Sequence, residues 1–323
     1  MSAGRIPITG SSAAGPGTPG PRASTEAPAG SIYDLGYRHY DGPRRGRFWA
    51  AWSLYVDSLR GIWGFGRPMT AKAAPFIIGG LYLLPAAFQL AFSSVIARQI
   101  ARGEATELLT YGNYFGGLGT LIVLFLIAQA PEVVCRDQRY QVLPLYFTRA
   151  IQRLDYALAR LASLATALFI VLMAPMVAIL VGDILMSSDT YKAIGEELPK
   201  ALPVIPSSAL IASGMAAIAL AVSSFTPRRA YAAIGVLAYF LLMEALPMGI
   251  YLAGHNRGAD WVNYLPLLTP NTALTGANHW FFGTPLTEQF PTTVGAGMYV
   301  LAGLVSLAFF TAVLINRYRR VSA

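Results

Sequence analysis

Hydrophobic residues in this chain form long runs separated by stretches of polar and charged positions. A helix needs about 20 mostly apolar residues to cross a bilayer. Six runs approach or exceed that length, and they lie at residues 74–97, 113–130, 157–182, 203–225, 230–253 and 293–316. The runs are continuous and do not alternate, so a membrane β-barrel is excluded. The pattern predicts an all-α integral membrane protein with six transmembrane helices.

A shorter amphipathic segment at residues 46–64 precedes the first run. Its apolar residues recur every three or four positions, which is the period of one helix face: Trp49, Trp52, Val56, Leu59 and Trp63. Asp57 and Arg60 fall on another face. Tryptophan beside arginine is typical of a helix that lies in the plane of the membrane. We expect Trp49 and Trp52 to anchor such an interfacial helix, either passively or with a mechanical role.

The composition agrees with a membrane protein. The 323 residues are 55% hydrophobic and 12% charged, whereas soluble proteins contain roughly 25% charged residues. Residues 1–30 consist largely of Gly, Pro, Ala and Ser and contain no signal-peptide core. Residues 1–44 are therefore expected to form a disordered cytoplasmic tail, and residues 45–323 the membrane domain. A single cysteine, Cys135, excludes an internal disulfide.

Lysine and arginine residues are distributed unevenly between the loops. Most of the 24 lie before the first run, between the second and third, between the fourth and fifth, or after the sixth. Positively charged loops face the cytoplasm. Both termini are therefore predicted to be cytoplasmic and residues 254–292 to lie outside, in a multi-pass protein of the plasma (inner) membrane. Because this placement accounts for the net charge of +8, nucleic acid is not expected as a partner.

The predicted cytoplasmic segment at residues 131–156 mixes charged and apolar residues in "PEVVCRDQRYQVLPLYFTRAIQRLDY". Pro131 should end the second helix, because its ring disfavours helix continuation. The segment is too polar to span a bilayer and too apolar to be a free loop, so it should lie at the interface or under a partner. Arg149, Arg153 and Asp155 stand where the third helix enters the lipid. They could bind lipid headgroups or a partner's carboxylates, or simply anchor the helix.

This order of features resembles the permease subunit of ABC-2 type ABC transporters. The resemblance covers about residues 45–320 and includes the interfacial helix, six spans, a long loop after the second span and the outer segment 254–292, whose "YLPLLTPNTALTG" resembles the family's short extracellular helices. Its most specific part is the segment 131–156, which is similar to the family's cytoplasmic coupling segment. The matching positions are Glu132, Arg136, Asp137, Arg139, Leu145, Tyr146, Arg149, Arg153, Asp155 and Tyr156.

The resemblance implies a type V exporter-like permease domain that pairs with a second copy or a related permease. Two copies of a separate ABC ATPase subunit would supply ATP and Mg, and the coupling segment would dock on that ATPase. The implied coupling residues are Glu132, Arg136, Asp137, Arg139 and Tyr140. The implied function is efflux of an amphiphilic substrate. No lysine in the chain follows a glycine, so the chain lacks a P-loop and is not expected to be an enzyme by itself.

One ionisable residue, Glu244, lies inside the fifth run, with Pro247 three residues further on. A charge within the membrane is costly, so Glu244 should face the helix bundle or a cavity. Glu244 and Pro247 could shape a substrate path, or Glu244 could bond a neighbouring helix. A proton relay is the third possibility, and it would favour a proton-coupled secondary transporter. A non-transporting membrane scaffold is a further alternative. The three histidines are isolated in sequence, and no metal site is expected.

Overall fold

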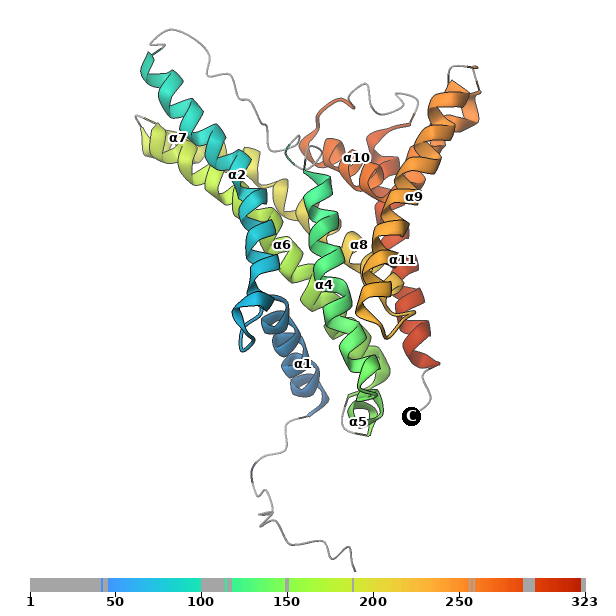
Figure 1. Ribbon diagram of the computed structural model, residues 1–323. Coiled ribbons are helices and arrows are strands. Elements are labelled where there is room, and N and C mark those ends of the chain that lie inside the picture. Colours follow the sequence, from blue (N-terminus) through green and yellow to red (C-terminus); the bar gives the residue numbers. More distant parts are fainter. Residues whose placement is uncertain are drawn as a thin grey trace, which may run out of the picture. The chain divides into compact units, whose positions relative to one another are not determined.

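The computed structural model describes residues 42, 46–99, 114, 118–148, 151–187, 189–255, 257, 259–286 and 294–320. All the regular structure in this described part is helical (Figure 1). The chain divides into two units, residues 1–44 and residues 45–323. The second unit is called the unit below. Apart from Gly42, the tail expected to be disordered lies outside the described residues.

Six of the described helical segments are long and apolar enough to cross a membrane, which confirms the predicted number of spans. They correspond to α2 (Met69–Gln99), α4 (Gly119–Arg139), α6 (Arg153–Met186), α8 (Val204–Ser223), α9 (Arg229–His255) and α11 (Ala296–Arg319). The shorter helices are α1 (Arg47–Ile62), α5 (Leu143–Phe147), α7 (Thr190–Ala201), η1 (Asp260–Leu268) and α10 (Pro270–Phe282).

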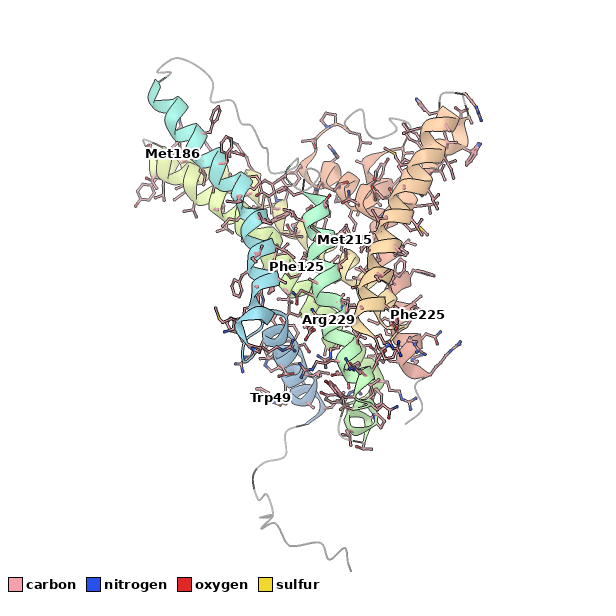
Figure 2. All side chains as sticks on the ribbon, viewed as in Figure 1. Trp49, Phe125, Met186, Met215, Phe225 and Arg229 are labelled. Atoms are coloured by element: carbon pink, nitrogen blue, oxygen red, sulfur yellow. The ribbon has the colours of Figure 1, made fainter. Side chains whose placement is uncertain are left out.

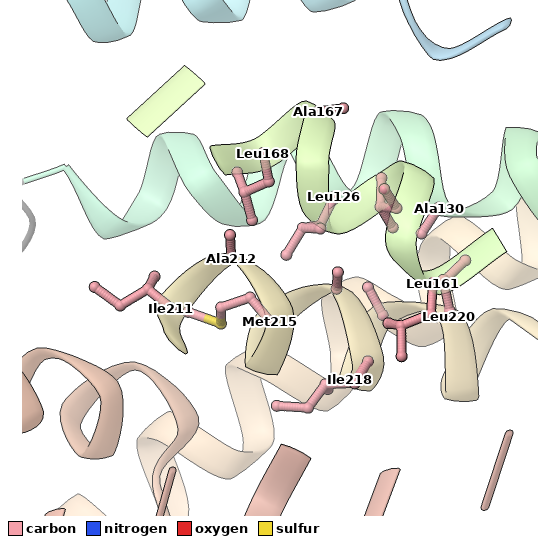
Figure 3. Packing of buried hydrophobic residues seen from close by; sticks show 14 of the residues in the cluster. Leu126, Ala130, Leu161, Ala167, Leu168, Ile211, Ala212, Met215, Ile218 and Leu220 are labelled. Carbon is pink, nitrogen blue, oxygen red and sulfur yellow. The ribbon is translucent and has the colours of Figure 1, made fainter. Parts of the chain in front are cut away.

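The helix α8 occupies the centre of the unit and packs against α4, α6, α9, α10 and α11. Figure 3 shows Met215 of α8 near Leu126 of α4 and Leu168 of α6. Most of α8 is buried, and it is rich in alanine and serine. Small residues let neighbouring helices approach closely in a membrane, where no hydrophobic effect drives association. A Cβ added at Gly214 would lie 3.3 Å from the side chain of Leu274 in α10.

The helices α2, α9 and α11 carry large apolar side chains on their outer faces (Figure 2). Phe88, Leu241 and Val305 are examples of these exposed residues. In water such surfaces would be unfavourable, whereas lipid tails solvate them well. The outer faces therefore agree with lipid as the surrounding solvent.

The helix α4 continues through Pro131 and ends at Arg139, so the expected helix end at Pro131 is wrong. Pro131 is buried among neighbouring helices, and in membrane proteins such neighbours compensate for the backbone hydrogen bond that proline removes. The chain instead leaves the helix at Gln141, whose φ of 53° is left-handed. The amide of Val142 donates to the carbonyl of Asp137 (3.1 Å), which satisfies a carbonyl of the last turn.

We expect close packing between α10 and α11 to limit side-chain size at Gly276. A Cβ there would lie 2.6 Å from the ring of Tyr299, which is buried. Gly276→Ala should therefore destabilise the fold by about 1–3 kcal/mol, the usual effect of overpacking. The measurement is the apparent Tm of the purified protein in detergent.

The matched control for this prediction is Gly249→Ala. Gly249 lies in α9 with open space around its Cβ direction, so the added methyl group should leave the Tm unchanged or raise it. Equal effects of the two substitutions would contradict the packing argument.

Candidate functional site

Charged side chains gather at one end of the unit, where α1, the start of α2, the last turns of α4, α5, the start of α6, the turn between α8 and α9, and the end of α11 meet (Figures 1 and 2). The helices α10 and η1 lie at the opposite end (Figure 1). The segments that the charge pattern assigned to one side of the membrane thus share one end. Which side this end faces stays a prediction.

A buried ion pair joins α4 to α6 at this end. Arg160 donates from Nη2 to Oδ2 of Asp137, and Tyr156 donates to the same oxygen (2.8 Å). The other terminal nitrogen of Arg160 donates to Oγ of Ser58 in α1 (2.7 Å). A buried charge is stable only when it is paired and hydrogen-bonded. These four side chains therefore act as one unit that fixes α1, α4 and α6 to one another.

A second carboxylate, Glu132 of α4, forms two ion pairs at once. Its Oε1 pairs with Nη1 of Arg67, in the turn before α2, and its Oε2 lies 2.9 Å from Nη1 of Arg229, the first residue of α9. The helices α2 and α9 flank α4 (Figure 1). One side chain of α4 thus connects the beginnings of both flanking helices.

The start of α6 is tied to α1 and α11. Arg47 of α1 donates to Asp155 from Nε (2.6 Å) and Nη2 (2.7 Å), and the backbone amide of Gln152 donates to Asp155 as well (3.1 Å). Arg153 donates to the carbonyl of Arg319 at the end of α11 (2.8 Å). The predicted anchors Arg153 and Asp155 are therefore engaged within the chain. The third, Arg149, lies outside the described residues.

An aromatic cluster fixes the short helix α5. The rings of Tyr146 and Phe147 lie 5.8 Å and 6.1 Å from that of Tyr156, which in turn lies 5.0 Å from that of Tyr318 in α11. Burial raises the pKa of the Tyr146 hydroxyl, with the carboxylate of Asp137 adding to the effect. Tyr146 is thus neutral at physiological pH and serves as an apolar support for α5.

The five implied coupling residues divide into two groups. Glu132 and Asp137 are partly buried and hold ion pairs within the chain. Arg136, Arg139 and Tyr140 are exposed, Tyr140 at 67%. Leu145 of α5 is 65% exposed as well. Together, Arg136, Arg139, Tyr140 and Leu145 form what we call the end surface.

The helix α1 has separate faces for the protein and for its surroundings. Leu54, Ser58 and Ile62 are buried, and α1 packs mainly on α6. Trp49 and Trp52 lie on another face and are 47% and 49% exposed. The two tryptophans are therefore half exposed on a face that does not pack on α6, and their role as interface anchors stays a prediction.

The intramembrane residue Glu244 lies beside the N-terminus of α10. Thr272 donates to its Oε1 (2.8 Å), and Asn271 lies beside the same carboxyl group. A helix N-terminus stabilises a carboxylate through its free amides and its dipole. Asn271 also touches Gly119 at the start of α4. Pro247 is buried inside α9, which continues to His255.

Several functional contacts were not predicted from the sequence. The sequence pattern does not indicate that Arg67 and Arg229 pair with Glu132, or that Arg160 contacts Asp137 and Ser58. The available signal for Arg160 was its position: an arginine that begins a hydrophobic run needs a partner. Among the described residues, no group of His, Cys, Asp and Glu side chains could hold a metal ion.

The fold and the charged end define an all-helical membrane protein with six candidate spans. A family profile described as "Protein of unknown function (DUF2705)" matches residues 76–320, and the chain belongs to this family. A search among curated proteins found no match to the chain.

We expect the Asp137–Arg160 pair to be essential for stability. Asp137→Ala leaves a buried guanidinium without its carboxylate, which should cost about 3–5 kcal/mol and lower the apparent Tm in detergent. The double variant Asp137→Leu, Arg160→Met removes both charges and should recover most of the loss. Asp57→Ala, at an exposed position on α1, is the control. A double variant no more stable than Asp137→Ala would contradict the assignment.

Proposed function

We propose that the protein is the transmembrane permease subunit of an ATP-driven exporter of the ABC-2 type. It moves an amphiphilic substrate across the plasma membrane, and a separate ATPase hydrolyses the ATP. The observation that carries this proposal is the end surface, which combines exposed charged and apolar side chains with a rigid support behind them. Such a surface suits a partner protein that must push or pull on the helices.

The contacts behind the end surface supply a stiff connection to the spans. A displacement at Tyr140 passes to the last turn of α4, where Asp137 is bonded to α6 through Arg160. A displacement at Leu145 passes through Phe147 to Tyr156, also in α6. Both routes end on buried groups, so a force on the surface moves helix ends instead of single side chains.

The double ion pair of Glu132 suits the movement that export requires. To open a path between α4 and a flanking helix, Glu132 must release either Arg67 or Arg229. Arg229 is the more exposed of the two arginines (64% against 24% for the side chain), so water can replace its contact more easily. We propose that the α9 side opens first.

The contacts of Glu244 favour a structural role over a proton relay. Its hydrogen bond with Thr272 ties α9 to α10 and gives the carboxyl group a polar partner at this depth. This observation supports the exporter over a proton-coupled secondary transporter. A non-transporting scaffold would not need the connected end surface.

In the proposed assembly, two ATPase subunits dock on a pair of permeases, formed by two copies of this chain or by this chain and a relative. Both chain termini and the end surface face the cytoplasm. ATP and Mg bind in the ATPase, and this chain contributes no catalytic residue.

The orientation can be tested with single cysteines at two exposed positions, Tyr140→Cys and Tyr191→Cys, in a Cys135→Ser background. Tyr191 lies in α7, at the far end of α6 from Arg153. In intact cells an impermeant thiol reagent should label Tyr191→Cys, and Tyr140→Cys only after lysis. The reverse pattern would overturn the orientation.

Docking can be tested with a photo-crosslinking amino acid at Tyr140. It should form an adduct with a protein that carries a P-loop, whereas the same group at Tyr191 should not. Arg136→Glu should weaken co-purification of that ATPase at least tenfold, because it reverses a charge at the contact. Lys192→Glu, exposed in α7, is the matched control. Unchanged co-purification of Arg136→Glu, together with no ATPase adduct at Tyr140, would refute the docking surface.

The role of Glu244 can be tested by comparing Glu244→Gln with Glu244→Leu. Glutamine retains an acceptor for Thr272, so the Tm and the ATPase activity of the complex should change little. Leucine loses that bond and should lower the Tm, by an amount that is not additive with Thr272→Val. A Glu244→Gln protein that folds normally but cannot support activity of the complex would favour the proton relay.

A further inference from the structure

A groove of about 990 Å³ lies between the predicted cytoplasmic halves of α4 and α9. Its polar lining consists of three arginines, Arg139, Arg228 and Arg229, with the amides of Gln138 and Gln141. None of the described residues that line the groove is acidic. Figure 2 labels Arg229 at the α4 side of α9. The groove therefore offers a strongly positive wall.

The groove changes from polar to apolar along its length. Ile127 and Ala233 line its other part, and both belong to candidate spans. Ile127 precedes Arg139 by 12 residues of α4, which corresponds to about 18 Å at 1.5 Å per residue. Half of a bilayer's hydrocarbon core is about 15 Å thick. A molecule in this groove thus meets charge at the water boundary and apolar side chains at membrane depth.

The positive charge of the groove is not balanced within the described part of the chain. Neither Arg139 nor Arg228 has an ion-pair partner there, and the guanidinium of Arg228 lies over the ring of Tyr231, 5.6 Å from its centre. Arg229 pairs with Glu132, but Arg67 shares that carboxylate. An anion in the groove would supply the missing charge, and guanidinium groups bind phosphate oxygens in pairs.

We propose that this groove binds an anionic phospholipid. The phosphate lies against Arg139 and Arg228 with support from Arg229, and an acyl chain follows Ile127 and Ala233 into the bilayer. The predicted orientation places the groove at the cytoplasmic leaflet, where anionic lipids are abundant and where basic pockets between spans bind their headgroups. Within the end surface, Arg139 then contacts the lipid, whereas Arg136, Tyr140 and Leu145 contact the ATPase.

The proposal can be tested by native mass spectrometry of the purified full-length protein in detergent, titrated with phosphatidylglycerol. The test variant is Arg139→Gln, Arg228→Gln. The loss of two arginines should weaken phosphatidylglycerol binding about thirtyfold, equivalent to about 2 kcal/mol. The matched control is Arg60→Gln, Arg320→Gln, which removes the same charge from exposed positions at the same end of the unit. The control should bind like the wild type.

Further arms separate the lipid from its headgroup and test the apolar part. Phosphatidylcholine, which has no net charge, should bind the wild type weakly and the test variant equally weakly. Glycerol phosphate should not compete at concentrations that saturate with phosphatidylglycerol. Ala233→Phe fills the apolar part and should weaken phosphatidylglycerol binding at least tenfold without removing charge.

The proposal is overturned if the test and control double variants lose affinity equally, if glycerol phosphate competes as well as the lipid, or if Ala233→Phe binds normally. Because binding is measured on the permease alone, failure here leaves the ATPase docking proposal untouched. Conversely, a protein that binds the lipid but never captures an ATPase would retain this site and lose the proposed function.

Discussion

The ion pair between Asp137 and Arg160 is the contact through which the charged end is held together. Because both groups are largely removed from water, each must be satisfied by protein, and the chain supplies Ser58 and Tyr156 for this purpose. Tyr156 also supports α5 and touches α11. Four helices and the short α5 thus meet around a single pair of charges. The groups that are hardest to bury are the ones that fix the helix ends.

Hydrophobic run length was sufficient to predict the six long helices, because lipid leaves helix as the main way to satisfy a continuous apolar segment. It failed where tertiary surroundings override local preference. Pro131 breaks helices in water, but here it is buried between packed helices and α4 continues for two more turns. The true end depends on the left-handed Gln141. Glutamine has no strong preference for that conformation, so this helix end could not be predicted from the residue type.

The composition of the charged end was predictable, but its pairing was not. Charge asymmetry correctly grouped the basic segments at one end. The partners of Glu132 lie 65 and 97 residues away in sequence, and no local spacing indicates such contacts. Glu132 and Asp137, which the resemblance implies as coupling residues, form ion pairs with arginines of the same chain, as buried or half-buried charges require. Glu132 and Asp137 are partly buried, whereas Arg136 and Tyr140 are exposed. Only the fold reveals this difference.

The enclosure of α8 has a consequence for biogenesis. Its small residues leave little side-chain bulk facing lipid, and its neighbours include α10 and α11, which are synthesised after it. On the nascent chain, the alanine- and serine-rich surface of α8 stays partly uncovered until α11 is inserted and packs against it. A ribosome that stops before α11 would leave that face open. The burial of α8 therefore depends on the last span of the chain.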